Sequence, residues 1–96
     1  MGNTEVAQRY LHSEVDIDSK QMVEVRLRGS AANVFLLDDL NFAKYKAHEG
    51  YRYFGGFSKK SPVRLRPPHP GRWHVVVDLG DRPGFVDASV SVIGAH

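Results

Sequence analysis

Trp73-His74-Val75-Val76-Val77-Asp78-Leu79 is the strongest β-strand pattern in the chain, and it decides the fold class. β-Branched and aromatic residues favour strands, and alternate positions of this run place its tryptophan, two valines and the leucine on one face. Residues 80–84 have the composition of a turn, and residues 85–93 alternate again. We therefore predict an antiparallel hairpin of these two strands. The side chains expected inside on the second strand are Val86, Ala88, Val90 and Val92.

Upstream segments repeat the strand pattern. Residues 22–28 and 63–66 alternate apolar with charged side chains, which is typical of strands with one face in water. Residues 34–37 are apolar throughout, so we expect this strand to be buried on both faces. Residues 6–12 fit either a further strand or a short helix. Short strands separated by turns predict an all-β fold, a single antiparallel β-sandwich of the jelly-roll kind.

One domain is expected over residues 1–96, with residues 1–8 as a candidate disordered end. A short helical insertion at about residues 38–50 interrupts the strands. Asp38 or Asp39 can cap its first turn, because a carboxylate accepts hydrogen bonds from the first helical N–H groups. Gly50 suits the left-handed position after the last turn. Leu40, Ala43 and Ala47 share one face of the expected helix.

Composition limits the class of protein. The 96 residues include no cysteine, which excludes disulfides, thiolate nucleophiles and cysteine-based zinc sites. No apolar run approaches the roughly 20 residues of a membrane span, and the first residues lack the apolar core of a signal peptide. We therefore expect a cytoplasmic protein with no membrane partner.

No catalytic or metal-binding motif emerges from the spacing of the polar residues. The five histidines do not show the spacing of a zinc site. Asp38, Asp39 and Asn41 could offer oxygens to calcium, but their spacing is not that of an EF-hand and no glutamate closes the loop. No serine lies in a Gly-x-Ser-x-Gly elbow. The sequence predicts no catalytic residue, no metal and no cofactor.

The insertion and the strand after it gather most side chains that can recognise a ligand or a partner. Tyrosine offers a rigid apolar body with one polar end, glycine lets another molecule approach the backbone, and histidine exchanges protons near neutral pH. In the alternative interpretation, Phe42 and Tyr45 fasten the insertion onto the sandwich, and both interpretations stay open. The candidate residues are Asp38, Asp39, Asn41, Tyr45, His48, Tyr51, Tyr53, Gly55 and Gly56.

A second candidate surface is basic. Residues 51–96 carry seven Lys and Arg against three Asp and Glu, although the net charge of the chain is only +2. Basic side chains beside aromatic rings are what single-stranded nucleic acid needs; an ordinary solvated face is the other interpretation. The candidate anion-binding or nucleic-acid-binding residues are Lys59, Lys60, Arg64, Arg66 and Arg72.

Several motifs resemble a bacterial family of domains of unknown function. They are Asn-Val-Phe-Leu-Leu-Asp-Asp at 33–39, Asn-Phe-x-x-Tyr at 41–45, Tyr-x-Gly-Gly at 53–56 and the run at 70–80. The similarity extends from about Tyr10 to Gly94. Lys20-Gln21 and Asp81 depart from the pattern where turn glycines are expected. Members occur alone or fused N-terminally to TIR domains, which implies a β-sandwich and a recognition module in bacterial signalling or defence. The resemblance supplies no catalytic residues.

These observations together predict a non-catalytic recognition or sensor module. It would bind a protein partner or a small ligand through residues 38–57. The alternatives are a nucleic-acid-binding module that uses the basic surface and a small enzyme whose site matches no known motif.

Overall fold

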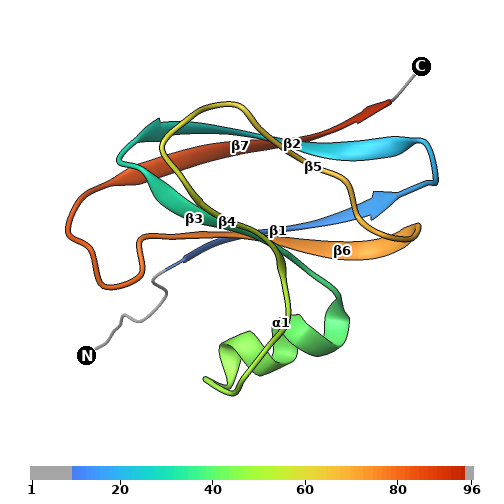
Figure 1. The fold of residues 1–96 in the computed structure, drawn as a ribbon, viewed down its shortest axis with the longest axis horizontal. Coiled ribbons are helices and arrows are strands. Elements are labelled where there is room, and N and C mark those ends of the chain that lie inside the picture. Colours follow the sequence, from blue (N-terminus) through green and yellow to red (C-terminus); the bar gives the residue numbers. More distant parts are fainter. Residues whose placement is uncertain (1–9, 95–96) are drawn as a thin grey trace, which may run out of the picture.

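Two stacked antiparallel sheets and one helix make up residues 10–94, the part of the chain that the structure, a computed structural model, describes (Figure 1). The four-stranded sheet has the order β1-β6-β3-β4, and the three-stranded sheet has the order β5-β2-β7. The predicted all-β sandwich with one short helix is confirmed. The elements are β1 (Tyr10–Ile17), β2 (Gln21–Gly29), β3 (Ala32–Leu37), α1 (Asp39–Lys46), β4 (Phe54–Ser58), β5 (Val63–Leu65), β6 (Gly71–Asp78) and β7 (Val86–Gly94).

The predicted hairpin is wrong, because β6 and β7 belong to different sheets. β6 already has a strand on each side, β1 and β3, and β7 pairs with β2 instead. The chain crosses between the sheets after residue 78, and the turn between β2 and β3 holds it there. Ser30 N donates to Phe85 O at 2.7 Å, and Phe85 N donates to the Ser30 hydroxyl at 3.1 Å. A Cβ on Gly29 would lie 2.4 Å from the same carbonyl oxygen, so glycine is needed at this crossing.

The inner faces of the two sheets form the main core. Its fully buried side chains include Val23, Val25, Val34, Leu36, Trp73, Val75 and Val77. Val86, Ala88 and Val90 pack against this core as predicted, but Val92 is 36% exposed and lies outside it. Apolar contact between sheets is the main stabilising term, at about 25 cal/mol per Å² of buried surface.

The outer face of the four-stranded sheet is apolar as well, because α1 covers it (Figure 1). Phe35, Leu37 and Val76 from the sheet pack with Phe42 from the helix. The prediction that residues 34–37 are buried on both faces is therefore confirmed. No helix in residues 10–94 is long and apolar enough to cross a membrane. Residues 1–8, the candidate disordered end, lie outside the described part, and residues 10–12 of the ambiguous 6–12 segment are strand.

Capping fixes both ends of α1. Asp38 is the N-cap, and its carboxylate accepts from Asn41 N. At the other end His48, not Gly50, adopts the left-handed conformation, with φ 59°. His48 N donates to Tyr45 O at 3.2 Å and Glu49 N donates to Lys44 O at 2.9 Å, the two bonds of a Schellman motif.

The face of α1 that Leu40, Ala43 and Ala47 share is turned to solvent. Leu40 is 64% exposed, and Ala43 and Ala47 are exposed too. The helix packs through Phe42 instead, because the sheet beneath offers aromatic and apolar partners for a ring.

Candidate functional site

A chain of hydrogen bonds beneath α1 joins a carboxylate to two imidazoles. Asp39 Oδ1 lies 2.6 Å from His74 Nε2, and His74 Nδ1 lies 2.9 Å from His12 Nε2. Because a carboxylate only accepts, His74 donates through Nε2 and its Nδ1 accepts from His12. Phe42 stacks on both imidazoles, with centroid distances of 4.1 and 4.5 Å. His74 is 6% exposed. The chain of hydrogen bonds therefore leads from the exposed Asp39 carboxylate, through the buried ring of His74, to the exposed ring of His12.

The electrostatic setting of this chain lowers two pKa values. Burial lowers the pKa of His12, and the charge of His74 adds to the effect. Hydrogen bonds from His74 and Arg72 lower the pKa of the Asp39 carboxyl. Arg72 Nη2 donates to Asp39 Oδ2 at 3.1 Å. The arrangement can exchange a proton with solvent at His12, and it ties the start of α1 to β6.

Acid should therefore destabilise the protein in two steps. The pKa of His12 is lower in the folded chain than the ordinary value near 6.5, so its contribution is present above about pH 6.5 and is lost as the pH falls from there toward the folded pKa. The lowered pKa of Asp39 gives a contribution that is lost below about pH 4. Urea unfolding at several pH values measures both. His12→Gln should flatten the first step, and His48→Asn, which keeps a residue suited to the left-handed turn, should not. An unchanged pH profile in His12→Gln would refute this account.

A second network centres on Asp78. Tyr45 Oη donates to Asp78 Oδ2 at 2.5 Å, and Asn33 Nδ2 donates to Asp78 Oδ1 at 2.8 Å. Burial, together with the hydrogen bond to Asp78, raises the pKa of the Tyr45 phenol far above its usual range. Tyr10 and Tyr51 pack edge-on against Tyr45 at 5.2 and 5.3 Å. Tyr45 is thus a protonated donor that holds the end of α1 against β6.

Asn41 closes the insertion from the other end. Its Nδ2 donates to Asp38 Oδ1 at 2.8 Å, and its Oδ1 accepts from Arg52 N at 2.8 Å. The side chain therefore ties the helix start to the chain that returns toward β4. Asn41, Phe42 and Tyr45 each fasten one part of the insertion, which gives a physical meaning to the Asn-Phe-x-x-Tyr spacing.

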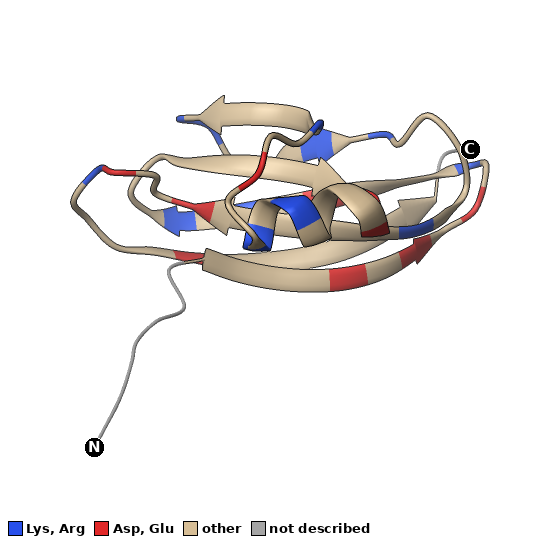
Figure 2. Cartoon of the chain, turned by 90° about the horizontal axis from the view of Figure 1, so that it is seen from below, with Lys and Arg blue, Asp and Glu red and all other residues tan. Residues whose placement is uncertain are grey.

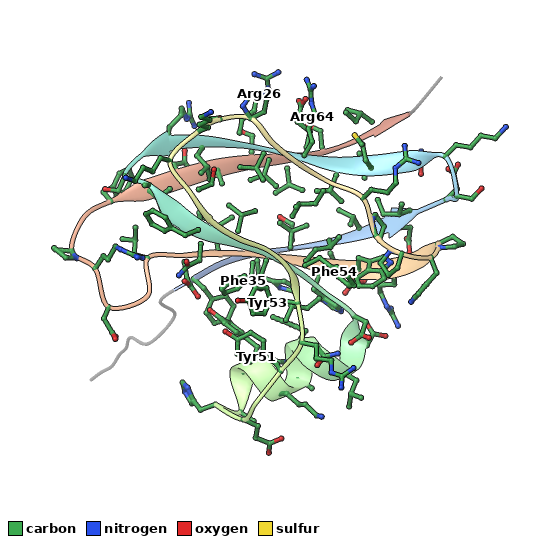
Figure 3. All side chains as sticks on the ribbon, in the orientation of Figure 1. Arg26, Phe35, Tyr51, Tyr53, Phe54 and Arg64 are labelled. Atoms are coloured by element: carbon green, nitrogen blue, oxygen red, sulfur yellow. The ribbon has the colours of Figure 1, made fainter. Side chains whose placement is uncertain are left out.

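Tyr51 and Tyr53 extend the aromatic cluster toward the edge of the sheet. Figure 3 shows Phe35, Tyr53 and Tyr51 between the sheet and α1, with ring centroids of Phe35 and Tyr53 4.3 Å apart. Burial is the main cause that raises the pKa of Tyr51. The exposed rings continue along β4, where Arg82 lies over Phe57 at 4.0 Å from its centroid. β4 is an edge strand, so this aromatic row borders solvent.

The glycine pair in β4 has a structural role at its first position. Gly55 has φ 108°, and a Cβ there would lie 2.2 Å from Val34 O. Gly56 has φ 151°, and a Cβ there would meet nothing within 4 Å. At Gly55 the backbone that approaches closely is therefore that of the neighbouring strand β3.

The structure splits the predicted basic stripe. Arg64 Nε bonds Glu24 Oε2 at 3.0 Å on the three-stranded sheet, and Arg26 shares the same carboxylate at 3.2 Å (Figure 3). Glu24, predicted on a wet face, is 8% exposed because these two arginines cover it. Arg72 lies in β6 of the four-stranded sheet, where it forms ion pairs with Asp39 of α1 and Glu14 of β1. Lys59, Lys60 and Arg66 are exposed.

The polar residues weighed as calcium ligands have protein partners. Asp38 caps α1, Asp39 bonds His74 and Arg72, and Asn41 bonds Asp38 and Arg52. Within residues 10–94, no three His, Asp or Glu side chains are arranged so that they could hold a metal ion.

A shallow groove lies away from these residues, where β1 borders the chain that leads into β7. Its volume is about 200 Å³. It is lined by Tyr10, Leu11, Val77, Asp78, Leu79, Gly84, Phe85 and Val86. Phe85 is 73% exposed at this place.

The fold and these contacts define a class of protein: a small β-sandwich with a helix docked on one sheet face and aromatic side chains along one sheet edge. The chain belongs to the family described as Domain of unknown function (DUF1883), whose model matches residues 8–96. The predicted resemblance to a domain family of unknown function is thereby confirmed. No curated protein and no solved structure matches the chain.

Sequence reasoning missed His12, His74 and Asp78 as partners of the insertion. His74 and Asp78 share one face of the strongest strand pattern, so two polar groups opposite the core face were a usable signal. The place of His12 had no such signal, because its pairing with residue 76 across β1 and β6 is a long-range register.

Proposed function

We propose that this protein is a non-catalytic recognition module that binds a protein partner along β4. One observation carries the proposal: Phe54 and Phe57 of the edge strand are 46% and 42% exposed, and Tyr53, directly before the strand, is 46% exposed. Aromatic side chains are enriched at protein interfaces, and an edge strand offers unpaired backbone groups to another strand.

The surroundings of β4 favour an extended partner over a small ligand. The described groove of about 200 Å³ is smaller than most ligand pockets and is not lined by the insertion residues. Arg52 precedes β4 and Lys59 and Lys60 follow it, so the aromatic row has cations at both ends. A role in bacterial cytoplasmic signalling or defence belongs to the same proposal and rests on the similarity to domains fused with TIR domains.

Site-specific photocrosslinking tests the proposal. A photoreactive amino acid replaces Phe57 on β4 in one variant and Ser89, an exposed residue of β7, in the control. We expect irradiation in the source cells to give a discrete protein adduct from position 57 and none from position 89. Adducts of equal amount from both positions, or none from position 57, would contradict recognition along β4.

Single-stranded nucleic acid is the second candidate, because exposed Lys59, Lys60 and Arg66 lie near the aromatic row. The same adduct decides between the two. If nuclease removes the adduct from position 57, and protease digestion leaves a peptide linked to nucleotide, the partner is nucleic acid. That result would contradict a protein partner.

A further inference from the structure

The two long sides of the sandwich carry opposite charge. β4 lies beside β5 on one side, and β1 lies beside β7 on the other. Residues 50–66, which include β4 and β5, contain five Lys and Arg and no Asp or Glu. Residues 10–19 contain three acidic residues and residues 86–94 one, and neither range contains Lys or Arg. Figure 2 shows this opposition, with blue at both ends of uncharged β4 and red on β1.

The edges on these two sides are also compatible in direction. β1 and β4 are the outermost strands of the four-stranded sheet, and in residues 10–94 neither has a paired strand on its outer side. Each neighbouring pair in this sheet is antiparallel, so β1 and β4 run in opposite directions. A second copy shifted sideways would therefore bring its β1 antiparallel to β4 and continue the sheet.

The β4 side and the β1 side also have complementary shapes at the two ends of one row of paired residues. Phe57 pairs with Asn33, Asn33 with Asp78, and Asp78 with Tyr10, so these residues form one row across the sheet. The exposed Phe57 is at one end of the row. The shallow apolar groove, which Tyr10 and Leu11 help to line, is at the other end.

We propose that β4 of one copy pairs with β1 of a second copy, so that the four-stranded sheets join side by side in an open row. Continuing the row places Phe57 next to the groove of the second copy. It also brings Arg52 near the second copy's Glu14 and Asp16, because antiparallel partners advance in opposite directions. A head-to-tail contact of this kind leaves one unused edge at each end and does not close on itself by simple translation. The inference rests on the proposed function, since it uses the same β4 surface and names the partner.

Sedimentation of the purified protein tests the assembly. We expect the mean mass to rise with concentration, to pass beyond the dimer without a plateau, and to fall when salt screens the charged sides. Hydrogen exchange should slow at β4 amides as the concentration increases. A chain that stays monomeric up to about 1 mM, where an interface of millimolar Kd would be half-occupied, would overturn the inference. A mass that stops at the dimer would overturn it too, because a closed pair would use one edge twice.

Two complementary variants locate the contact. Phe57→Lys places a cation on the β4 edge, and Asp16→Lys removes an anion from β1 and adds a cation. Each should weaken association about tenfold or more. Phe57→Lys would place a charge against the apolar groove of the second copy, and Asp16→Lys would bring a cation close to Arg52. Their equimolar mixture should form a dimer and no larger species, since only one wild-type interface remains between the two variants. Ser89→Lys, which adds the same charge to the outer face of β7, is the control and should assemble like the wild type.

The outcomes also separate this inference from the proposed function. If Phe57→Lys unfolds, Arg52→Glu serves as the β4 variant, because the bond to Asn41 uses the backbone of residue 52. Monomers at every concentration, together with an adduct from position 57 to a different protein, would overturn self-assembly and leave recognition in place. Unaltered assembly in both edge variants would show that copies meet elsewhere and would overturn the inference.

Discussion

Gly55→Ala should destabilise the protein by about 3 kcal/mol, since a side chain at φ 108° is strained and its Cβ would lie 2.2 Å from a backbone oxygen of β3. β3 cannot yield easily, because Val34, whose carbonyl oxygen this is, is fully buried in the core. Urea unfolding of the variant measures the loss. We also expect hydrogen exchange to speed up first in β4, the strand that the substitution pushes outward.

Two other glycines supply matched controls for this prediction. Gly56→Ala meets no atom within 4 Å but keeps a positive φ of 151°, so it should cost about 1 kcal/mol of backbone strain. Gly50→Ala meets no atom within 4 Å and has no positive φ, so its effect should stay within about 0.5 kcal/mol. Equal losses at positions 50 and 55 would refute the argument from close approach.

Phe42→Ala should cost about 3 kcal/mol as well, because it removes a ring that is 7% exposed and leaves a cavity beneath α1. The ring also covers His12 and His74. Its loss should let water reach the imidazoles, and the pKa of His12, which burial lowers, should rise toward its ordinary value. NMR titration of the histidine ring protons measures this rise beside the stability change.

Leu40→Ala is the control for Phe42→Ala on the same helix. Leu40 is 64% exposed, so its truncation should change stability by less than about 0.5 kcal/mol and leave the His12 titration unaltered. The pair of variants separates loss of packing from a change in helix propensity. A large loss in Leu40→Ala would mean that α1 is docked through its other face.

Local patterns predicted the strands well, because the spacing of apolar residues in each strand reflects which of its faces are buried. Alternation at 22–28 and 63–66 and the apolar run at 34–37 all correspond to observed strands. The composition of residues 80–84 predicted a turn, but it did not predict which sheet the next strand joins. A short turn can fold back within a sheet or cross to the other one, and the contact of Phe85 with Ser30 decides between them over a separation of 55 residues.

The place of the insertion was predicted, but its orientation was left open. Spacing put Leu40, Ala43 and Ala47 on one face, and docking through Phe42 and Tyr45 was one of two interpretations. The sheet beneath offers apolar partners to Phe42 and so decides the orientation. A usable signal was the apolar run at 34–37, since a strand buried on both faces requires an apolar cover on its outer side. The chain from Asp39 through His74 to His12 joins three distant segments, and spacing within each segment carries no trace of it.

The pairing of β2 with β7 has a consequence for folding during synthesis on the ribosome. β2 finds its long partner at the far end of the sequence, where Gln21 pairs with Gly94. During synthesis, β2 must wait until almost the whole domain has left the ribosome, with only the short β5 available earlier. Contacts between remote segments also slow folding. The nascent chain thus exposes the apolar face of β2 for most of its translation, and a truncation before residue 86 would leave that strand permanently without its main neighbour.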